Sequence, residues 1–170
     1  MIILSLGSNL SSSYGNRFFN LDLALSYLNH YEIRITKQSS YFESPSYPNI
    51  NNPKFINIVI SVESDLDPVN FASVIIFIEN KLERVRNKKN DPRTCDIDII
   101  DFDRKVINFK YKNSDFSVPH KQLSYRNFVL YPLREILPKW THPETNEQVG
   151  DLIKKLDTED KKYILKVEKP

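Results

Sequence analysis

The stretch that decides the fold is PRTCDIDII, residues 92–100, in which two aspartates alternate with isoleucines. Successive side chains of a β-strand point to opposite faces, so this alternation predicts a strand with Asp96 and Asp98 on one face and Ile97 and Ile99 on the other. Residues two apart on a strand are separated by roughly 7 Å. The two carboxylates are therefore expected side by side, where they repel each other unless a cation joins them.

Outward from this strand, the periodicity of apolar residues and the turn residues predict the other elements. The expected elements are a strand over Ile2–Leu6, a turn at Gly7–Asn9, a helix over Asn16–Asn29, a strand over Glu32–Phe42, a loop over 44–53, a strand over Phe55–Val62, a helix from Asp67 to Arg84 and a strand over Cys95–Phe102. This β-α-β-β-α-β order predicts an α+β fold of the ferredoxin-like kind, an antiparallel sheet with both helices on one face.

A C-terminal extension is expected to follow this unit. Segments 105–109 and 115–118 are expected to form a hairpin arm, and 128–137 and 147–156 to form two short helices. The last dozen residues are strongly charged, and we expect them to be frayed.

Length and composition narrow the class of protein. The chain has 170 residues, 40% hydrophobic and 27% charged, so we expect one domain over 1–170. The single cysteine, Cys95, excludes a disulfide framework and a cysteine-based zinc site. No apolar run approaches the roughly 18 residues of a membrane span, and the N-terminal MIILSLG lacks the basic region of a signal peptide. We therefore expect a cytoplasmic protein.

The glycines and the charges limit how a phosphate group could be bound. Only Gly7, Gly15 and Gly150 are present, so neither glycine-rich nucleotide motif can occur. Side-chain cations and metal ions would have to hold a nucleotide. Residues 81–93 contain six basic and two acidic side chains, which suits phosphate groups but is also typical of a solvated surface. A net charge of +2 does not indicate a polyanion binder.

The paired aspartates have a chemical interpretation. Two carboxylates suit Mg²⁺, which takes few protein ligands and fills its other positions with water and phosphate oxygens. Arg93 precedes Asp96 by three residues, and Arg84 and Arg86 end the preceding helix. Magnesium carboxylates beside arginines are typical of phosphoryl transfer. On spacing alone, the alternative that Asp96 and Asp98 lie on a solvated sheet surface stays open.

Strand 55–62 supplies a second pair of functional candidates. Phe55 and Asn57 share one face, opposite the isoleucines that must pack on the helices. If this face and that of Asp96 and Asp98 are one helix-free face, an aromatic ring, an amide and two carboxylates meet in one cleft. The alternative of a solvated face leaves an exposed Phe55 unexplained.

Four features of the sequence occur in a fixed order and cover most of the chain. They are Gly7-Ser8-Asn9 after the first strand, PRTCDIDII at 92–100, Val118-Pro119-His120 followed by Arg126 and Phe128, and Leu130-Tyr131-Pro132-Leu133 with Glu135-Ile136. In this order and spacing the chain resembles the 6-hydroxymethyl-7,8-dihydropterin pyrophosphokinases of folate biosynthesis, whose core motif is P-R-x-x-D-[LIV]-D-[LIVM]-[LIVM].

The resemblance implies an activity. The family transfers a diphosphate from ATP to the hydroxymethyl oxygen of 6-hydroxymethyl-7,8-dihydropterin, and attack at the β-phosphorus releases AMP. It further implies two Mg²⁺ ions as cofactors, ATP and the pterin as the partners, a monomer, and no nucleic-acid or membrane partner.

The resemblance also implies roles for individual residues. Asp96 and Asp98 would bind both metal ions, with Arg84, Arg93 and His120 beside them as catalytic residues. The expected ATP-binding residues are Glu79, Arg84, Arg86, Arg93, Ile99, Ser117, His120 and Arg126. The expected pterin-binding residues are Ser44, Pro45, Tyr47, Phe55, Asn57 and Phe128. Among these, the two phenylalanines would stack on the ring, Asn57 would read its amide edge, and Glu79 would support the basic loop.

The chain departs from the family pattern at three places. Asn90-Asp91 stands where an aromatic-Gly pair is frequent, and Lys121 stands where a tyrosine follows the histidine. The arm over 110–115 is longer than usual and lacks a basic residue near Asp115, for which Lys112 could substitute. We expect these departures to tune affinity or rate.

Two functions from other classes remain as alternatives. A ferredoxin-like sheet with exposed aromatics can stack nucleotides as an RNA-binding module, which would give salt-sensitive binding without dependence on magnesium. The same aspartates could serve a two-metal nuclease, which would cleave DNA or RNA.

Overall fold

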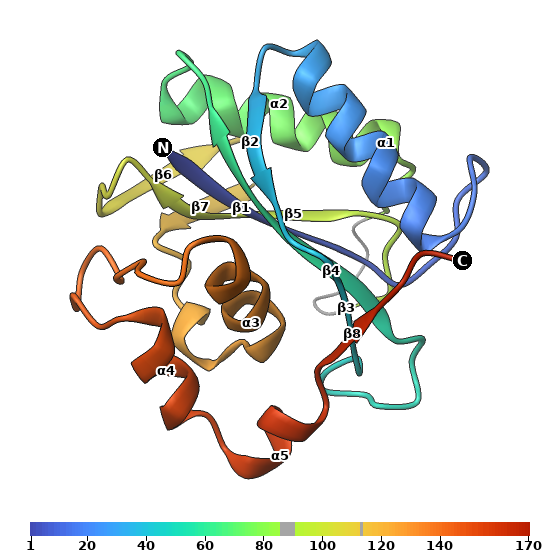
Figure 1. Ribbon diagram of the computed structural model, residues 1–170. Coiled ribbons are helices and arrows are strands. Elements are labelled where there is room, and N and C mark those ends of the chain that lie inside the picture. The colour runs from blue at the N-terminus through green and yellow to red at the C-terminus, as the bar shows by residue number, and fades with distance from the viewer. Residues whose placement is uncertain (86–90, 113) are drawn as a thin grey trace.

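The computed structural model describes residues 1–85, 91–112 and 114–170. Figure 1 shows a mixed α/β fold in which one antiparallel sheet has helices on both faces. The main strand order is β5 (Asp96–Phe102), β1 (Ile2–Ser8), β4 (Phe55–Glu63), β3 (Tyr41–Ser44) and β8 (Leu165–Val167), and β2 (Arg34–Gln38) also pairs with β4. In the described ranges, no helix is long and apolar enough to cross a membrane.

Two helices cover the first face of the sheet, as the sequence predicts. Helix α1 (Arg17–His30) begins after Asn16, whose side chain accepts a hydrogen bond from Phe19 N. Helix α2 (Pro68–Lys81) begins after Asp67, which caps it in the same way. It ends three residues before the predicted Arg84, because Glu83 adopts a left-handed φ of 62° that no helix can continue.

The second face is not free of helices, and the prediction that it would be is wrong. Ile3, Val59 and Ile100 point away from α1 and α2 and are fully buried. They pack against the apolar side of α3 (Asn127–Ile136) and against α4 (Val149–Lys155), which cover this face in Figure 1. The free part of the face is therefore limited to the end of the sheet that carries Asn57 and Asp96.

Three predicted strand boundaries need correction. Strand β1 continues through Gly7 and Ser8, because backbone pairing with β4 persists where a turn was expected. The strand predicted over 32–42 is two strands, because the regular strand pairing is interrupted at Ser39. The Ser39 backbone N–H donates to Val59 O, and the Ser39 hydroxyl accepts a hydrogen bond from Val59 N. Strand β5 begins at Asp96.

The C-terminal third adds a hairpin, helices and one edge strand. Strands β6 (Ile107–Tyr111) and β7 (Ser114–Val118) pair with each other, and a 3₁₀ turn, η1 (Leu123–Tyr125), precedes α3. After α5 (Thr158–Lys162), the chain does not fray as expected, because β8 pairs with β3. Lys166 reinforces this attachment with an ion pair to Glu135 at 2.9 Å.

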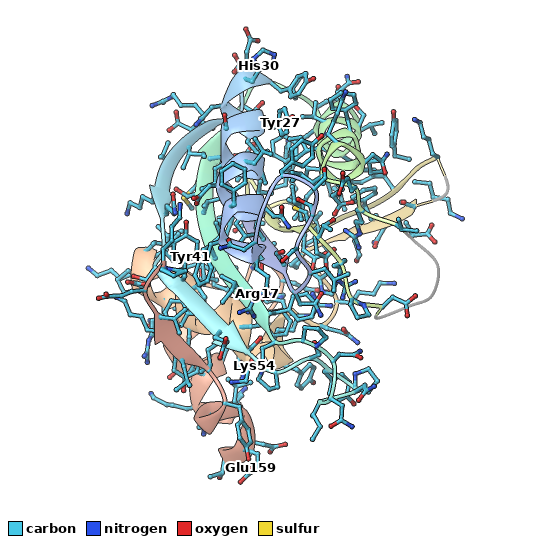
Figure 2. All side chains as sticks on the ribbon, turned by 90° about the vertical axis from the view of Figure 1, so that its right-hand side faces the viewer. Arg17, Tyr27, His30, Tyr41, Lys54 and Glu159 are labelled. Carbon is cyan, nitrogen blue, oxygen red and sulfur yellow. The ribbon has the colours of Figure 1, made fainter. Side chains whose placement is uncertain are left out.

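The start of α1 is fastened to the edge of the sheet near β3. Arg17 Nη1 donates to Lys54 O at 2.5 Å, and Lys54 Nζ pairs with Glu43 at 2.8 Å. Figure 2 shows Arg17 and Lys54 near the end of β3, with Tyr41 at its beginning. These contacts fix the segment just before β4, from which Phe55 and Asn57 project.

Candidate active site

Asp96 and Asp98 project from the first half of β5, and each carboxylate meets arginines from other segments. Arg84 Nη1 lies 2.5 Å from Asp96 Oδ1, and Arg93 Nε lies 3.4 Å from Asp96 Oδ2. Arg126 Nη1 donates to Asp98 Oδ2 at 2.6 Å. The repulsion expected between the aspartates is thus offset by three guanidinium groups.

These ion pairs change the acid–base properties of the groups. Burial alone would raise the pKa of the Asp96 carboxyl, but Arg84 and Arg93 outweigh it, and the pKa is lowered. Burial would lower the pKa of the Arg84 guanidinium, whereas Asp96 and Glu79 raise it above its ordinary value. Both groups are therefore charged at neutral pH.

Glu79 holds Arg84 in place from the side of α2. Its carboxylate forms an ion pair with Arg84 and accepts a hydrogen bond from Ile97 N at 2.9 Å. Glu79 is 1% exposed. These two contacts link the end of α2 to Arg84 and to the backbone of β5.

Two of the three arginines that contact the aspartates, Arg93 and Arg126, also lie over an aromatic ring. Arg93 Cζ is 5.4 Å from the centre of the Phe55 ring, and Arg126 Cζ is 5.5 Å from that of Phe128. Such distances are within the range of cation–π attraction. Both predicted stacking residues are thus joined to the aspartates through one guanidinium each.

The register of three strands brings Asn57 and Asp96 onto the same face. Gly7 of β1 is paired directly with Asn57 of β4 on one side and with Asp96 of β5 on the other. Residues opposite one another in antiparallel strands point to the same face. The expectation that the amide and the carboxylates share a face is confirmed, and the residue between them has no side chain.

Space above Gly7 is limited. A Cβ atom at this position would lie 3.2 Å from Asn57 Oδ1 and 3.4 Å from Phe55 Cδ1. Glycine therefore leaves a strip without a side chain between the amide and Asp96, and a methyl group there would press against Asn57 and Phe55. The sequence analysis assigned Gly7 to a turn and missed this role.

Five of the six predicted pterin residues lie at one end of β3 and β4 or in the loop that follows β3, and the sixth, Phe128, belongs to α3. The Asn57 side chain is 3% exposed and donates to Phe42 O and to Ser44 Oγ, at 3.2 and 3.0 Å. Its carbonyl oxygen faces Gly7. Pro45 and Tyr47 follow β3 in the loop, where Tyr47 is 84% exposed.

Asn9 connects this loop with the arginine segment. Its side-chain oxygen accepts from Arg93 N at 2.6 Å, and its Nδ2 donates to Ser46 Oγ and Pro53 O. Its backbone N–H donates to Arg93 O at 3.0 Å. The sequence analysis quoted Gly7-Ser8-Asn9 as a motif without giving Asn9 a role, although a polar residue after a buried strand was the available signal.

Seven of the predicted ATP-binding and metal-binding residues line one cavity. The cavity has a volume of about 160 Å³ and lies between α2, the β5 edge and β7. Among its lining residues are Glu79, Arg84, Asp96, Asp98, Ile99, Ser117 and His120. Arg93 and Arg126 do not line it but reach the aspartates from beside it.

His120 lies in this cavity in its neutral form. Burial lowers the pKa of its imidazole, and Arg126 acts in the same direction, although Asp98 opposes both. Its Nδ1 accepts a hydrogen bond from Gln122 N at 3.1 Å, which leaves Nε2 as the nitrogen for a ligand.

The donor set suits a hard divalent cation such as magnesium. Among the described residues, no group of three or more His, Cys, Asp or Glu side chains could enclose a metal ion. Two neighbouring carboxylates with oxygen donors suit an ion that keeps most of its water and shares phosphate oxygens. Asp96 and Asp98 are the residues that would hold it.

The remaining predicted features are residues that fall outside the described ranges and the places where the sequence departs from the family pattern. Arg86 and Asn90 lie outside the described residues. Lys121 is exposed, and the arm over 110–115 carries an ion pair between Lys110 and Asp115 at 3.3 Å.

The sequence and the fold are similar to those of known proteins. Residues 3–138 match the family described as 7,8-dihydro-6-hydroxymethylpterin-pyrophosphokinase (HPPK). The chain is 34% identical over 134 residues to the 2-amino-4-hydroxy-6-hydroxymethyldihydropteridine pyrophosphokinase of Bacillus subtilis, covering 78% of this chain and 75% of that protein.

Longer proteins contain a similar segment. The chain is 31% identical over 157 residues to the folic acid synthesis protein fol1 of Schizosaccharomyces pombe, covering 92% of this chain but only 20% of that protein. The fold is similar to a crystal structure of Plasmodium falciparum HPPK-DHPS, with a TM-score of 0.71, 17% identity, and coverage of 91% of this chain and 44% of that one. The chain therefore belongs to the 7,8-dihydro-6-hydroxymethylpterin-pyrophosphokinase family.

Proposed function

We propose that this chain transfers a diphosphate group from ATP to 6-hydroxymethyl-7,8-dihydropterin. The hydroxymethyl oxygen attacks the β-phosphorus of ATP, and a new P–O bond forms there. The bond between the β-phosphorus and the oxygen bridging to the α-phosphorus breaks, so AMP leaves and the hydroxyl proton is released. The products are AMP and the pterin diphosphate.

One observation carries this proposal. Arg93 lies over Phe55 and contacts Asp96, while Arg126 lies over Phe128 and contacts Asp98. The two aromatic rings suit a flat heterocycle, and the two carboxylates suit a phosphate-bound cation. In each of the two pairs, one guanidinium group contacts both the ring and the carboxylate. A substrate pair that joins a pterin to a triphosphate needs this combination.

On the pterin side, Phe55 and Phe128 would stack on the two faces of the ring. Asn57 would read the ring's amide edge, since Ser44 and the Phe42 carbonyl hold its side chain in one orientation. Gly7 would leave room for the ring beside Asn57 Oδ1. Ser44, Pro45 and Tyr47 would supply the loop contacts.

On the ATP side, Arg84 and Arg93 would bind phosphate oxygens and stabilise the negative charge that develops during transfer. His120 and Arg126 would complete the phosphate-binding wall, and Arg86 would extend it. Ile99 and Ser117, on the cavity wall, would contact adenosine. Two magnesium ions bound by Asp96 and Asp98 would neutralise phosphate charge and orient the triphosphate.

We further propose that residues 1–170 form one monomeric cytoplasmic domain with the ferredoxin-like arrangement. The strand order β5-β1-β4-β3, with α1 and α2 as the crossovers, supports this arrangement. Gel filtration with light scattering tests the monomer, since a dimer would elute at twice the mass of 20.0 kDa.

The decisive experiment is nucleotide product analysis with ATP, Mg²⁺ and 6-hydroxymethyl-7,8-dihydropterin. We expect AMP in amounts equal to the pterin diphosphate, and only when pterin and metal are both present. ADP in place of AMP would mean transfer of the γ-phosphoryl group. Absence of turnover under these conditions would refute the proposal.

A further inference from the structure

A second cavity lies at the end of α3 that is remote from Arg126 and Phe128. Its volume is about 450 Å³, and its walls come from the last residues of α3, the connection to α4, β2 and the turn after β5. Figure 1 shows the N-terminal end of β1 on the same side of the molecule as the orange α3–α4 connection. Volumes of roughly 300–1,000 Å³ are typical of small-molecule sites.

One part of the cavity is apolar. Ile136 and Leu137, at the end of α3, and Trp140 form this part. The Trp140 ring is held in place, because its Nε1 donates to Asp101 Oδ2 at 2.9 Å. The apolar wall is therefore fixed by a buried hydrogen bond.

The other part is basic. Lys37, Arg104 and Lys139 line the cavity. Lys37 Nζ donates to Ile136 O at 3.2 Å, and Arg104 Nη1 donates to Thr141 O at 2.9 Å. Both side chains are thereby oriented, although a carbonyl oxygen carries no net charge to neutralise them.

The neighbouring carboxylates of Asp101 and Asp103 offset the positive charge of these three groups only in part. Within the part of the chain that the structure describes, none of them forms an ion pair with a carboxylate, whereas Lys154, Lys155 and Lys166 nearby in the C-terminal third each do. Asp103, beside Arg104, is engaged by the amino group of Met1 at 2.5 Å. Three cations around one cavity give it a positive potential.

We propose that this cavity binds a small organic anion with an apolar body and a phosphate or carboxylate group. The apolar body would lie against Ile136, Leu137 and Trp140, and the anionic group would meet Arg104 and Lys139. Desolvation of the body and charge-assisted hydrogen bonds to the anion both favour binding. The site is separate from the proposed diphosphate transfer and does not depend on it.

Trp140 makes the proposal directly measurable, because it is the only tryptophan in the chain. Titration with phenyl phosphate is expected to give a saturable change in tryptophan emission. Inorganic phosphate and phenol, each carrying one half of the recognised chemistry, should bind at least about tenfold more weakly. An equal response to inorganic phosphate would contradict the role of the apolar wall, and no saturable change with phenyl phosphate would overturn the proposal.

A matched pair of variants locates the anion. Arg104→Gln removes a cation from the cavity, whereas Lys105→Gln removes one from the next residue, whose Nζ lies over the Phe102 ring at 5.5 Å. Arg104→Gln should raise the Kd for phenyl phosphate about tenfold, and Lys105→Gln less than about twofold.

Lys139→Gln provides an independent test, because Lys139 is exposed and its loss should not affect folding. It should weaken phenyl phosphate binding about threefold or more. Equal effects of the cavity variants and Lys105→Gln would refute the site.

Discussion

Strand β5 carries aspartates toward both ends, and their surroundings differ. At the first end, Asp96 and Asp98 keep side chains that are 25% and 28% exposed and face three arginines. Toward the other end, Asp101 is fully buried and accepts hydrogen bonds from Trp140 Nε1 at 2.9 Å and Arg104 N at 2.7 Å. One end of the strand is open to substrate, and the other holds the C-terminal segment to the sheet.

The comparison shows that the role of an aspartate on this strand depends on the groups that its side chain contacts. Asp96 and Asp98 face charged guanidinium groups and remain partly exposed, so phosphate or a metal ion can reach them. Asp101 is fully buried and accepts hydrogen bonds from two donors, so removing it leaves both donors without this acceptor. The first end should therefore govern activity and the second stability.

The largest expected effect is at the open end. Asp98→Ala should lower kcat by about a thousandfold or more, because a metal ligand contributes several kcal/mol of transition-state stabilisation. The melting temperature should stay near that of the wild type, since Asp98 is partly exposed. AMP formation and thermal unfolding measure the two quantities.

Asp151→Ala serves as the control for removal of a carboxylate, because Asp151 is an exposed residue of α4 paired with Lys154. It should leave activity unchanged. If Asp98→Ala retained more than about a tenth of the wild-type kcat, its metal-binding role would be wrong.

The next largest effect is expected at the buried end of β5, where a substitution should lower stability and not activity. Asp101→Ala should lower the free energy of unfolding by about 3 kcal/mol, because Trp140 Nε1 and Arg104 N lose their acceptor. Urea denaturation measures the loss, which corresponds to a melting temperature about 6–12 °C lower. Activity per folded molecule should persist.

Asp101→Asn is the matched control, since it keeps one acceptor oxygen and the size of the side chain. It should lose less stability than Asp101→Ala. A loss of catalysis by the folded Asp101→Ala protein, with stability intact, would reverse the assignment of the two ends.

A smaller effect is expected from filling the strip between Asn57 and Asp96. Gly7→Ala places a Cβ 3.2 Å from Asn57 Oδ1, so the KM for the pterin should rise about tenfold while kcat changes little. Steady-state kinetics separates the two constants. Gly150→Ala is the control, because nothing lies within 4 Å of a Cβ there. Equal kinetics for both variants would contradict the proposed pterin position.

The smallest effect is a pH dependence near the buried end. Burial lowers the pKa of His142, whose Nδ1 accepts hydrogen bonds from Glu144 N and Thr145 N at 3.2 and 3.3 Å. The unfolded chain then binds a proton more readily, so this residue costs stability as pH falls below the ordinary histidine pKa of about 6.5.

The free energy of unfolding should therefore fall less steeply between pH 7 and pH 5.5 in His142→Gln than in the wild type. The difference should arise mainly below about pH 6.5. Urea denaturation at both pH values measures this slope. An unchanged slope in His142→Gln would show that His142 does not contribute.

Local patterns predicted the strands and helices best where side chains alternate cleanly. Strand Phe55–Val62 and the starts of α1 and α2 near Asn16 and Asp67 follow from local periodicity and local hydrogen bonds. The second helical layer did not follow, because nothing local to Ile3 or Val59 shows that α3 will cover them.

The β-bulge in β5 shows the same limit within one strand. Pairing with β1 shifts between Ile3 and Leu4, so that Ile99 faces Leu4 and Asp101 faces Ile3, with Ile100 as the extra residue. Simple alternation would place Asp101 on the same face as Ile97. The bulge turns it toward Trp140, which is 39 residues away in the sequence.

The sequence by itself determined the family, the order of helices and strands up to β5 apart from the division of 32–42 into β2 and β3, and the common face of Asp96 and Asp98, because motifs and period-two alternation are local properties. Only the tertiary structure decided which arginine meets which aspartate, that Gly7 separates Asn57 from Asp96, and that Asp101 is a buried anchor. These depend on strand register and on packing between distant segments, which are set by the free energy of the whole fold.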